Sequence, residues 1–395
     1  MKGPIAAILA TILVTSLSLV AVACSGSSEA TAYDNKAVEL LQAESWQQAI
    51  TELDSAIKLD PNFAKAYNHR GIARNNLGQH EQAIADYDKA TELDPKNASA
   101  YSNRGIARND LGQYQQSLAD FDTAIELDPK NASAYNHRGT AHLKLEQYAK
   151  AFADFDKAIE LDPKNASAYS NRGMARNYLG QHDQALADYD KAVELGPTQT
   201  ELATVYSNQG VAYTDLRQYP QALVALNKAI ELTPNSASAY SNRGTAYLKL
   251  EQYAKALADF DKAIELGLTQ NDLATVYSNR SSAHSGLKQY EQALADLNKA
   301  IELDPKNASA YNNRGLHYAN HGTGGAGAGW EAALADYDKA IALNPEFTEA
   351  YYNRGHEYAE LNNHEMAKAD YEKALSLTSD PYLVDLIQKS IRLLK

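Results

Sequence analysis

Apolar and polar positions along most of the chain follow a helical spacing. In residues 98–131, small and apolar side chains fall on one face of two consecutive segments, because they recur every three or four residues. Gly112 separates the two segments and Pro129 ends the second. Glycine permits the left-handed turn that stops a helix, and proline cannot continue one. The pattern therefore predicts two short helices joined by a tight turn.

The same pattern returns every 34 residues, for example from Ala132, Ala166 and Ala237. A fixed period of this size is typical of an array of stacked helical units. In such an array each helix pair contacts only its neighbours. We therefore expect one elongated all-α domain without a central globular core.

Three positions of the repeating unit resemble a known family signature. An aromatic residue on the first helix recurs as Tyr67, Tyr101, Tyr135, Tyr169, Tyr206, Tyr240, Tyr277, Tyr311 and Tyr351. Four residues later stands a glycine, replaced once by Ser281, at Gly71, Gly105, Gly139, Gly173, Gly210, Gly244, Gly315 and Gly355. The second helix pairs an alanine with an aromatic residue, as in Ala83 with Tyr87, Ala151 with Phe155, Ala256 with Phe260 and Ala333 with Tyr337. The chain resembles the tetratricopeptide repeat (TPR), with its signature W-x2-L-G-x2-Y, then A-x3-F, then P.

One position departs from that signature. The leucine of the family is arginine in most repeats, with Gln209 as an exception, at Arg70, Arg104, Arg138, Arg172, Arg243, Arg280, Arg314 and Arg354. Acids such as Asp86 and Asp120 follow on the second helix of the same repeat. Because a row of unpaired arginines would repel itself, we predict ion pairs within the array.

The resemblance implies an α-solenoid, a right-handed superhelix of about ten helix-turn-helix units. Counted from a weaker first unit, the array spans 30–378, with units near 30–63, 64–97, 98–131, 132–165, 166–202, 203–236, 237–273, 274–307, 308–347 and 348–378. Longer connections at 198–202 and 269–273 predict an extra turn at the start of the next first helix. Residues 379–395 predict a capping helix that begins at Asp380 and Pro381.

Residues 1–23 have the features of a signal peptide. Lys2 precedes an apolar run, and small residues then lead to Cys24, the only cysteine of the chain. This ending resembles the lipobox of bacterial lipoproteins, which implies a lipid on Cys24 and a flexible tether over 24–31. A retained membrane anchor and cleavage by a conventional peptidase are the alternatives. All three place the repeats outside the cytoplasm, and lipidation predicts anchoring to a bacterial membrane, facing the periplasm or the cell surface.

Charge and motifs exclude several classes of function. The formal net charge is −13 and no basic stripe is visible, which argues against a nucleic-acid partner. No convergent titratable groups are visible, so we expect neither catalysis nor a cofactor. The segment Gly322–Gly329 contains G-x-G-x-x-G, but a dinucleotide site needs a preceding strand, so we predict a mobile loop. His317 and His321 are spaced to share a metal, yet no third ligand is placed and we predict none.

An amide recurs at the position before the arginine. We call the following residues the asparagine ladder: Asn103, Asn171, Asn208, Asn242, Asn279, Asn313 and Asn353. First helices line the concave surface in the TPR family and stand about 8–10 Å apart. An extended peptide advances roughly 3.3 Å per residue, so each asparagine would meet about every third peptide unit. The arrangement looks like the asparagine ladder in the repeat superhelix of O-GlcNAc transferase. The alternative is that these amides only bond neighbouring first helices.

The resemblance and the ladder together predict a non-catalytic scaffold. It would bind proteins or extended peptides in its concave groove and help to assemble complexes of the cell envelope. Few lysines reach this groove, so a clamp for a terminal carboxylate is not expected. The alternative is a solute-binding lipoprotein that holds glycan or peptide fragments through its tyrosines and asparagines.

Overall fold

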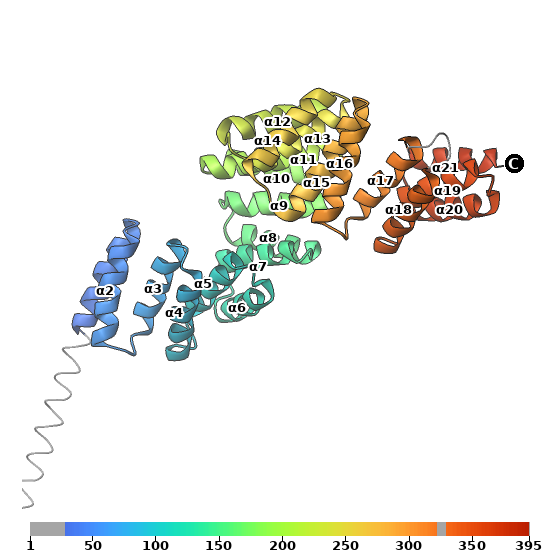
Figure 1. Ribbon diagram of the computed structural model, residues 1–395. Helices are drawn as coiled ribbons and strands as arrows, with labels where there is room; N and C mark the ends of the chain where they lie inside the picture. Colours follow the sequence, from blue (N-terminus) through green and yellow to red (C-terminus); the bar gives the residue numbers. More distant parts are fainter. Residues whose placement is uncertain (1–27, 322–328, 395) are drawn as a thin grey trace, which may run out of the picture. The chain divides into compact units, whose positions relative to one another are not determined.

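The computed structural model describes residues 28–321 and 329–394. The signal peptide, Cys24 and all but the last residue of the glycine-rich segment lie outside the described residues, and what the sequence predicts for them stays a prediction. Every regular element of the described part is a helix, and consecutive helices pack in pairs (Figure 1). The α-solenoid predicted from the repeat is thus confirmed. None of the described helices is long and apolar enough to cross a membrane.

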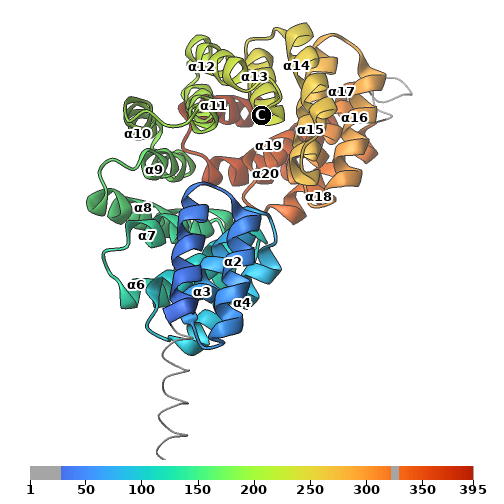
Figure 2. The same ribbon diagram turned by 90° about the vertical axis from the view of Figure 1, so that its left-hand side faces the viewer.

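The first of two compact units ends at Gly196. Its described part opens with the helical residues 28–42. The following helices are α2 (Trp46–Leu59), α3 (Ala64–Asn76), α4 (His80–Leu93), α5 (Ala98–Asp110), α6 (Tyr114–Leu127), α7 (Ala132–Lys144), α8 (Tyr148–Leu161), α9 (Ala166–Tyr178) and α10 (His182–Glu194). Figure 2 shows α2, α3 and α4 side by side. From α3 to α20, odd-numbered helices are the first helices of a repeat and even-numbered ones the second.

The second unit comprises residues 197–395. Its helices are α11 (Gln199–Asp215), α12 (Tyr219–Leu232), α13 (Ala237–Lys249), α14 (Tyr253–Leu266), α15 (Gln270–Gly286), α16 (Tyr290–Leu303), α17 (Ala308–His321), α18 (Trp330–Leu343), α19 (Thr348–Glu360), α20 (His364–Leu377) and α21 (Pro381–Leu393). First helices again pair with the second helices that follow them.

Close packing within a pair explains the recurring glycine. A Cβ atom on Gly105 of α5 would lie 2.8 Å from the ring of Phe121 on α6, which is fully buried. Interiors are packed too densely for a ring to move aside freely, so the position admits glycine only. The turn after α5 uses a second glycine differently, because Gly112 has φ +72. That conformation is open to glycine without steric cost.

The two longer connections lengthen the helices that follow them. α11 and α15 have 17 residues each, whereas α5 and α9 have 13. Thr198 caps α11, since its side chain accepts a hydrogen bond from the N–H of Glu201. Glu201 bonds back to the N–H of Thr198 and completes a capping box.

Helix α21 closes the C-terminal end of the second unit. The Asp380 side chain caps its start by accepting from the N–H of Tyr382, and Pro381 occupies the first turn. Ile387 is fully buried in a cluster with Tyr371 and Ala374 of α20. This helix therefore covers the apolar face that a further repeat would otherwise cover, as the sequence predicted.

Curvature places the first helices on the inside of each unit. Successive first helices contact one another, as α3 with α5 and α7 with α9 in the first unit, and α13 with α15 and α15 with α17 in the second. Successive second helices make no comparable contact among the described residues. Elements that approach more closely lie on the inner side of a bend. We call the exposed surface of the first helices the inner face.

Candidate functional site

The arginines behind the inner face are held by carboxylates. Arg104 donates to Asp120 of its own second helix at 2.6 Å and to Asp88 of the preceding second helix at 2.7 Å. Asp120 is 2% exposed and also accepts from Arg108 at 2.7 Å. The Arg104 guanidinium lies 5.2 Å from the Tyr101 ring. The predicted ion pairs within the array are confirmed, and they reach into the neighbouring repeat as well.

The same linkage recurs along both units. Each of these arginines pairs with its own buried aspartate and with an oxygen on the preceding second helix: Arg70, Arg138, Arg172, Arg243, Arg280, Arg314 and Arg354. Hydrogen bonds to Asp154 raise the pKa of Arg138, although burial opposes them. Bidentate pairs of this kind fix geometry. The arginines are therefore engaged in the structure and are not available to a ligand.

The ladder amides use their nitrogens to bond the preceding first helix. Asn103 Nδ2 donates to Asn68 Oδ1 at 3.1 Å, and Asn313 Nδ2 donates to Ser278 Oγ at 3.2 Å. Asn171, Asn242, Asn279 and Asn353 make equivalent bonds to Asn136, Ser207, Thr245 and Asn312. The bonding between first helices that the sequence left as an alternative is therefore present.

The ladder oxygens are placed differently from the nitrogens. In the described parts of the chain, no hydrogen bond is donated to Oδ1 of Asn103, Asn171, Asn242, Asn279 or Asn353. These side chains are half-buried. The inner face therefore presents a row of acceptors whose orientation is fixed by the bonds of their own nitrogens.

Asn208 departs from the rest of the ladder. Its Nδ2 is buried and has no hydrogen-bond partner within the described residues. For every other member the acceptor lies on the preceding first helix. A buried donor without a partner costs about 1–3 kcal/mol.

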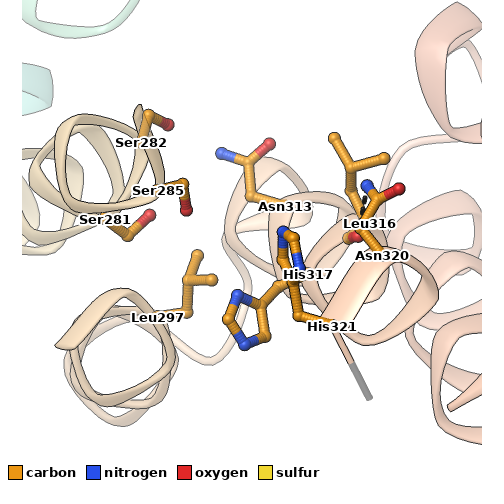
Figure 3. Close-up of a pocket in the computed structure, with 9 residues that line it drawn as sticks. All are labelled: Ser281, Ser282, Ser285, Leu297, Asn313, Leu316, His317, Asn320 and His321. Carbon is orange, nitrogen blue, oxygen red and sulfur yellow. Dashed lines mark hydrogen bonds between the residues drawn. The ribbon is translucent and has the colours of Figure 1, made fainter. Parts of the chain in front are cut away.

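One hollow opens on the inner face of the second unit. A cavity of about 220 Å³ lies between α15, α16 and α17, lined by Ser281, Ser282, Ser285, Leu297, Asn313, Leu316, His317, Asn320 and His321. Figure 3 shows the serines of α15 and Leu297 of α16 on one side and Asn313, His317 and His321 of α17 across from them. None of these side chains carries a fixed charge. The cavity adjoins the ladder through Asn313.

His317 is one of the residues that line this cavity. The residue is 8% exposed, and its Nδ1 atom has no hydrogen-bond partner among the described residues. Burial lowers the pKa of His317, and the nearby charge of His321 lowers it further. The imidazole is therefore neutral at pH 7. The described residues contain no group of three or more His, Cys, Asp or Glu side chains that could hold a metal ion.

Sequence models of the tetratricopeptide repeat match the chain along most of its length. The matches cover residues 37–78, 73–108, 102–166, 164–235, 237–266, 286–322, 330–362 and 348–381. The chain belongs to the tetratricopeptide repeat family. TPR arrays are scaffolds for protein interaction and are typically non-catalytic, and no catalytic family is among these matches. At this general level the protein is an interaction scaffold.

Two solved structures with TM-scores just above 0.5 share the fold. A tetratricopeptide repeat protein from Parabacteroides merdae ATCC 43184 matches 65% of this chain and 99% of its own, with 20% identity and a TM-score of 0.51. The APC/C hetero-tetramer Cut9-Hcn1 matches 84% of both chains, with 17% identity and a TM-score of 0.51. MamA from Desulfovibrio magneticus RS-1 matches 42% of this chain and 94% of its own, with 26% identity and a TM-score of 0.39. No curated protein matches the sequence.

From the sequence, His317 is a candidate only for binding a metal together with His321. The TPR structure brings it together with Ser281 and Leu297, which lie on two other helices. A signal was present in the sequence, because all three residues depart from the repeat. Ser281 replaces a glycine, Leu297 an aromatic residue and His317 an alanine such as Ala107 or Ala246.

Proposed function

We propose that this TPR protein is an adaptor anchored outside the cytoplasm by a lipid on Cys24, which binds extended polypeptide segments along its inner face. The observation that carries the proposal is the row of ladder oxygens. An extended peptide presents backbone N–H groups at regular intervals, and these are the donors that such acceptors need. Recognition through the backbone would tolerate many side-chain sequences, which suits an adaptor for assembly of envelope complexes.

The charge of the inner face supports the same proposal. In the second unit, the positions of α15 and α17 around the ladder are uncharged, namely Thr275, Asn279, Ser282, Ser309, Asn313, Leu316 and Asn320. Exposed acids lie on the second helices, as with Glu231, Glu265 and Glu302, and at the ends of first helices, as with Asp272, Glu349 and Glu360. A neutral surface neither repels nor selects a peptide by its net charge.

Peptide binding tests the adaptor proposal. Dodecapeptides selected from a random library on the wild-type protein are measured against a variant with Asn242→Ala, Asn279→Ala and Asn353→Ala. Each lost hydrogen bond contributes about 0.5–1.5 kcal/mol, so we expect binding at least about tenfold weaker. The matched control changes Glu231, Glu265 and Glu302 to alanine, one exposed residue in each of the second helices α12, α14 and α16.

The results of these binding measurements distinguish the peptide-binding adaptor from the solute-binding alternative. Equal loss in both variants, or none in the ladder variant, would show that the ladder is not the binding surface. Circular dichroism confirms that both variants remain folded. Stabilisation by glycan fragments, with no peptide enriched, would instead favour the solute-binding alternative.

Membrane attachment is tested separately. In a bacterial host, the wild-type chain should incorporate an alkyne-labelled fatty acid and fractionate with membranes, while Cys24→Ser should do neither. Membrane retention of Cys24→Ser with an uncleaved leader would favour the alternative of a transmembrane anchor.

A further inference from the structure

A second cavity lies between the last repeat and the helix that caps it. α21 packs on α20, but it makes no contact with α19 comparable to that between α17 and α19. A cavity of about 340 Å³ lies between α19, α20 and α21, the last three helices in Figure 1, and we call it the cap cavity. Cavities that bind small molecules usually have volumes of about 300–1,000 Å³. The cap cavity therefore has room for a small molecule.

Two residues of α19 that line the cap cavity depart from the repeat. Tyr352 stands where the first helices α3 to α17 have asparagine or serine, and its hydroxyl lies 3.4 Å from Ser390 Oγ of α21. His356 stands where those helices have no ionisable side chain, namely at Ile72, Ile106, Thr140, Met174, Val211, Thr245, Ser282 and Leu316. The surface that α19 turns toward the cap thus differs from that of the other first helices.

Part of the lining is apolar. The rings of Tyr352 and Tyr371 lie side by side, with 5.6 Å between their centroids. Leu386 and Leu393 of α21 add aliphatic surface, and Leu393 is 76% exposed. Covering exposed apolar surface is favourable in water. This part of the cavity therefore favours an apolar group.

Two groups of opposite charge lie on the same lining. Glu360 is the last residue of α19, and Lys389 lies on α21. Within the described residues, neither side chain forms an ion pair or a hydrogen bond. In the same repeat Arg354 is paired with Asp370 at 2.7 Å and with Asp338 at 2.6 Å. Glu360 and Lys389, in contrast, are both available to a ligand.

The lining selects the chemistry of that ligand. An ammonium group is attracted by Glu360, and a carboxylate is attracted by Lys389. A molecule with a single charge meets one opposite and one like charge, whereas a zwitterion can pair with both. Together with the apolar part of the lining, this describes a small zwitterion with an apolar side chain.

We propose that the cap cavity binds a free α-amino acid with an apolar side chain, such as leucine. Its ammonium pairs with Glu360 and its carboxylate with Lys389, while its side chain packs against the Tyr352 ring and Leu393. The site adds a small-molecule ligand to a protein that otherwise binds polypeptide. Because the ligand contacts both α19 and α21, its binding stabilises the attachment of the cap helix.

The test compares ligands that each lack one feature of leucine. Titration calorimetry on the full chain uses L-leucine, 4-methylpentanoate without the ammonium, 3-methylbutylamine without the carboxylate, glycine without the side chain, and N-acetylleucine methylamide without either charge. We expect saturable binding of leucine. Each of the other four should bind at least about tenfold more weakly, as expected for loss of a bond to a charged group or of the apolar contact.

Variants of the two charged residues test their roles. Glu360→Gln and Lys389→Gln should each weaken leucine binding by about tenfold. The matched controls are Glu349→Gln at the start of α19 and Lys373→Gln on α20, because both residues are exposed and neither lines the cavity. These controls should bind leucine like the wild type.

A third variant narrows the cavity. Ala359 lines it, and leucine stands at the same position of the repeat in α7 and α13, at Leu143 and Leu248. Ala359→Leu should therefore fold, which circular dichroism checks, and it should lose leucine binding.

NMR locates the bound ligand. The imidazole signals of the ten histidines are recorded by ¹H–¹³C NMR, and His356 is assigned by the loss of its signal in His356→Leu. That variant carries the leucine that α17 has at Leu316. Leucine should shift the His356 signal saturably and leave the histidines of the first unit unchanged.

Several results would overturn the proposal. Equal binding of 4-methylpentanoate or 3-methylbutylamine would show a site for a single charge, and equal binding of N-acetylleucine methylamide would show a subsite for a side chain of a bound polypeptide. No heat of binding together with no shift of His356 would show that the cavity takes no amino acid. The adaptor proposal is tested by peptides and the ladder variant, so it stands or fails separately.

Discussion

The α5–α6 pair and the α15–α17 region build the same repeat in two ways. Between α5 and α6, Gly105 meets the Phe121 ring, and the buried Asp120 is saturated by two arginines. Between α15 and α17, the ring is absent, a serine replaces the glycine, and an imidazole is left without a partner at Nδ1. The first arrangement pairs its buried carboxylate within the fold. The second leaves one buried ring nitrogen without a partner among the described residues.

The largest expected effect is a loss of stability in the α5–α6 pair, which we call the regular region. Asp120→Ala would leave Arg104 and Arg108 partly buried without their shared counter-charge, so we expect the free energy of unfolding to fall by about 3–5 kcal/mol. Asp122→Ala is the matched control, because the Asp122 side chain is 65% exposed and its pair with Arg138 is worth about 1 kcal/mol at most. Urea unfolding followed by circular dichroism measures both. Equal losses would contradict the difference between buried and exposed acids.

A second prediction converts one region toward the other. Leu297→Phe alone would press a ring against the Ser281 side chain and should destabilise the protein by about 1–3 kcal/mol. Adding Ser281→Gly should recover most of that loss, because glycine leaves room for the ring. A double-mutant cycle measures the coupling. Additive effects of the two changes would show that the residues do not compete for the same space.

The ladder gives a smaller effect. Asn313→Ala removes the hydrogen bond to Ser278 and should lower the free energy of unfolding by about 1 kcal/mol. Asn320→Ala on the same helix is the control, since the exposed Asn320 bonds only to the carbonyl of Leu316 one turn earlier. Alanine is the better helix former, so this variant should be neutral or slightly more stable. Equal losses would mean that the bond between helices contributes little.

The smallest effect is a pH dependence. The folded state lowers the pKa of His317 below 6.5, its ordinary value, through burial and then through His321. The unfolded chain therefore binds more protons as the pH falls below 6.5, and stability that is present above this pH is lost on acidification. His317→Ala should have a flatter profile of unfolding free energy between pH 7.5 and 5.5. Identical profiles would indicate that His317 titrates normally when folded.

A second histidine serves as the comparison for that profile. Burial also lowers the pKa of His137, with Asp110 opposing it, so His137→Ala should flatten the profile in the same direction. The Tyr318 ring lies beside His317, with 6.2 Å between the ring centroids.

The regular region could be predicted well because its chemistry is local and repeated. The helices are predicted by the 34-residue period together with Gly112 and Pro129, where they end. The ion pairs are predicted by the recurrence of arginine and aspartate in each repeat. The direction of the ladder amides could not be predicted, since the period does not show which end of an amide faces the next helix. The structure turns Nδ2 of Asn103 toward Asn68 and so assigns the oxygen to the inner face.

The cavity was hidden from the sequence for a different reason. Spacing along α17 associates His317 with His321, whereas the contacts with Ser281 and Leu297 cross between helices. An alignment of the repeats with one another marks all three positions as departures. Their meeting point becomes visible only when α15, α16 and α17 are packed together.

The arginine that reaches backward has a consequence for biosynthesis. Arg104 closes its own hairpin on Asp120 and at the same time engages Asp88, which was translated earlier. A helix pair that leaves the ribosome can therefore form an ion pair with the helix pair translated just before it. We expect the repeats to fold one after another from the N-terminus. Helix α21 carries no such arginine, and it ends the process by covering the last pair with Ile387.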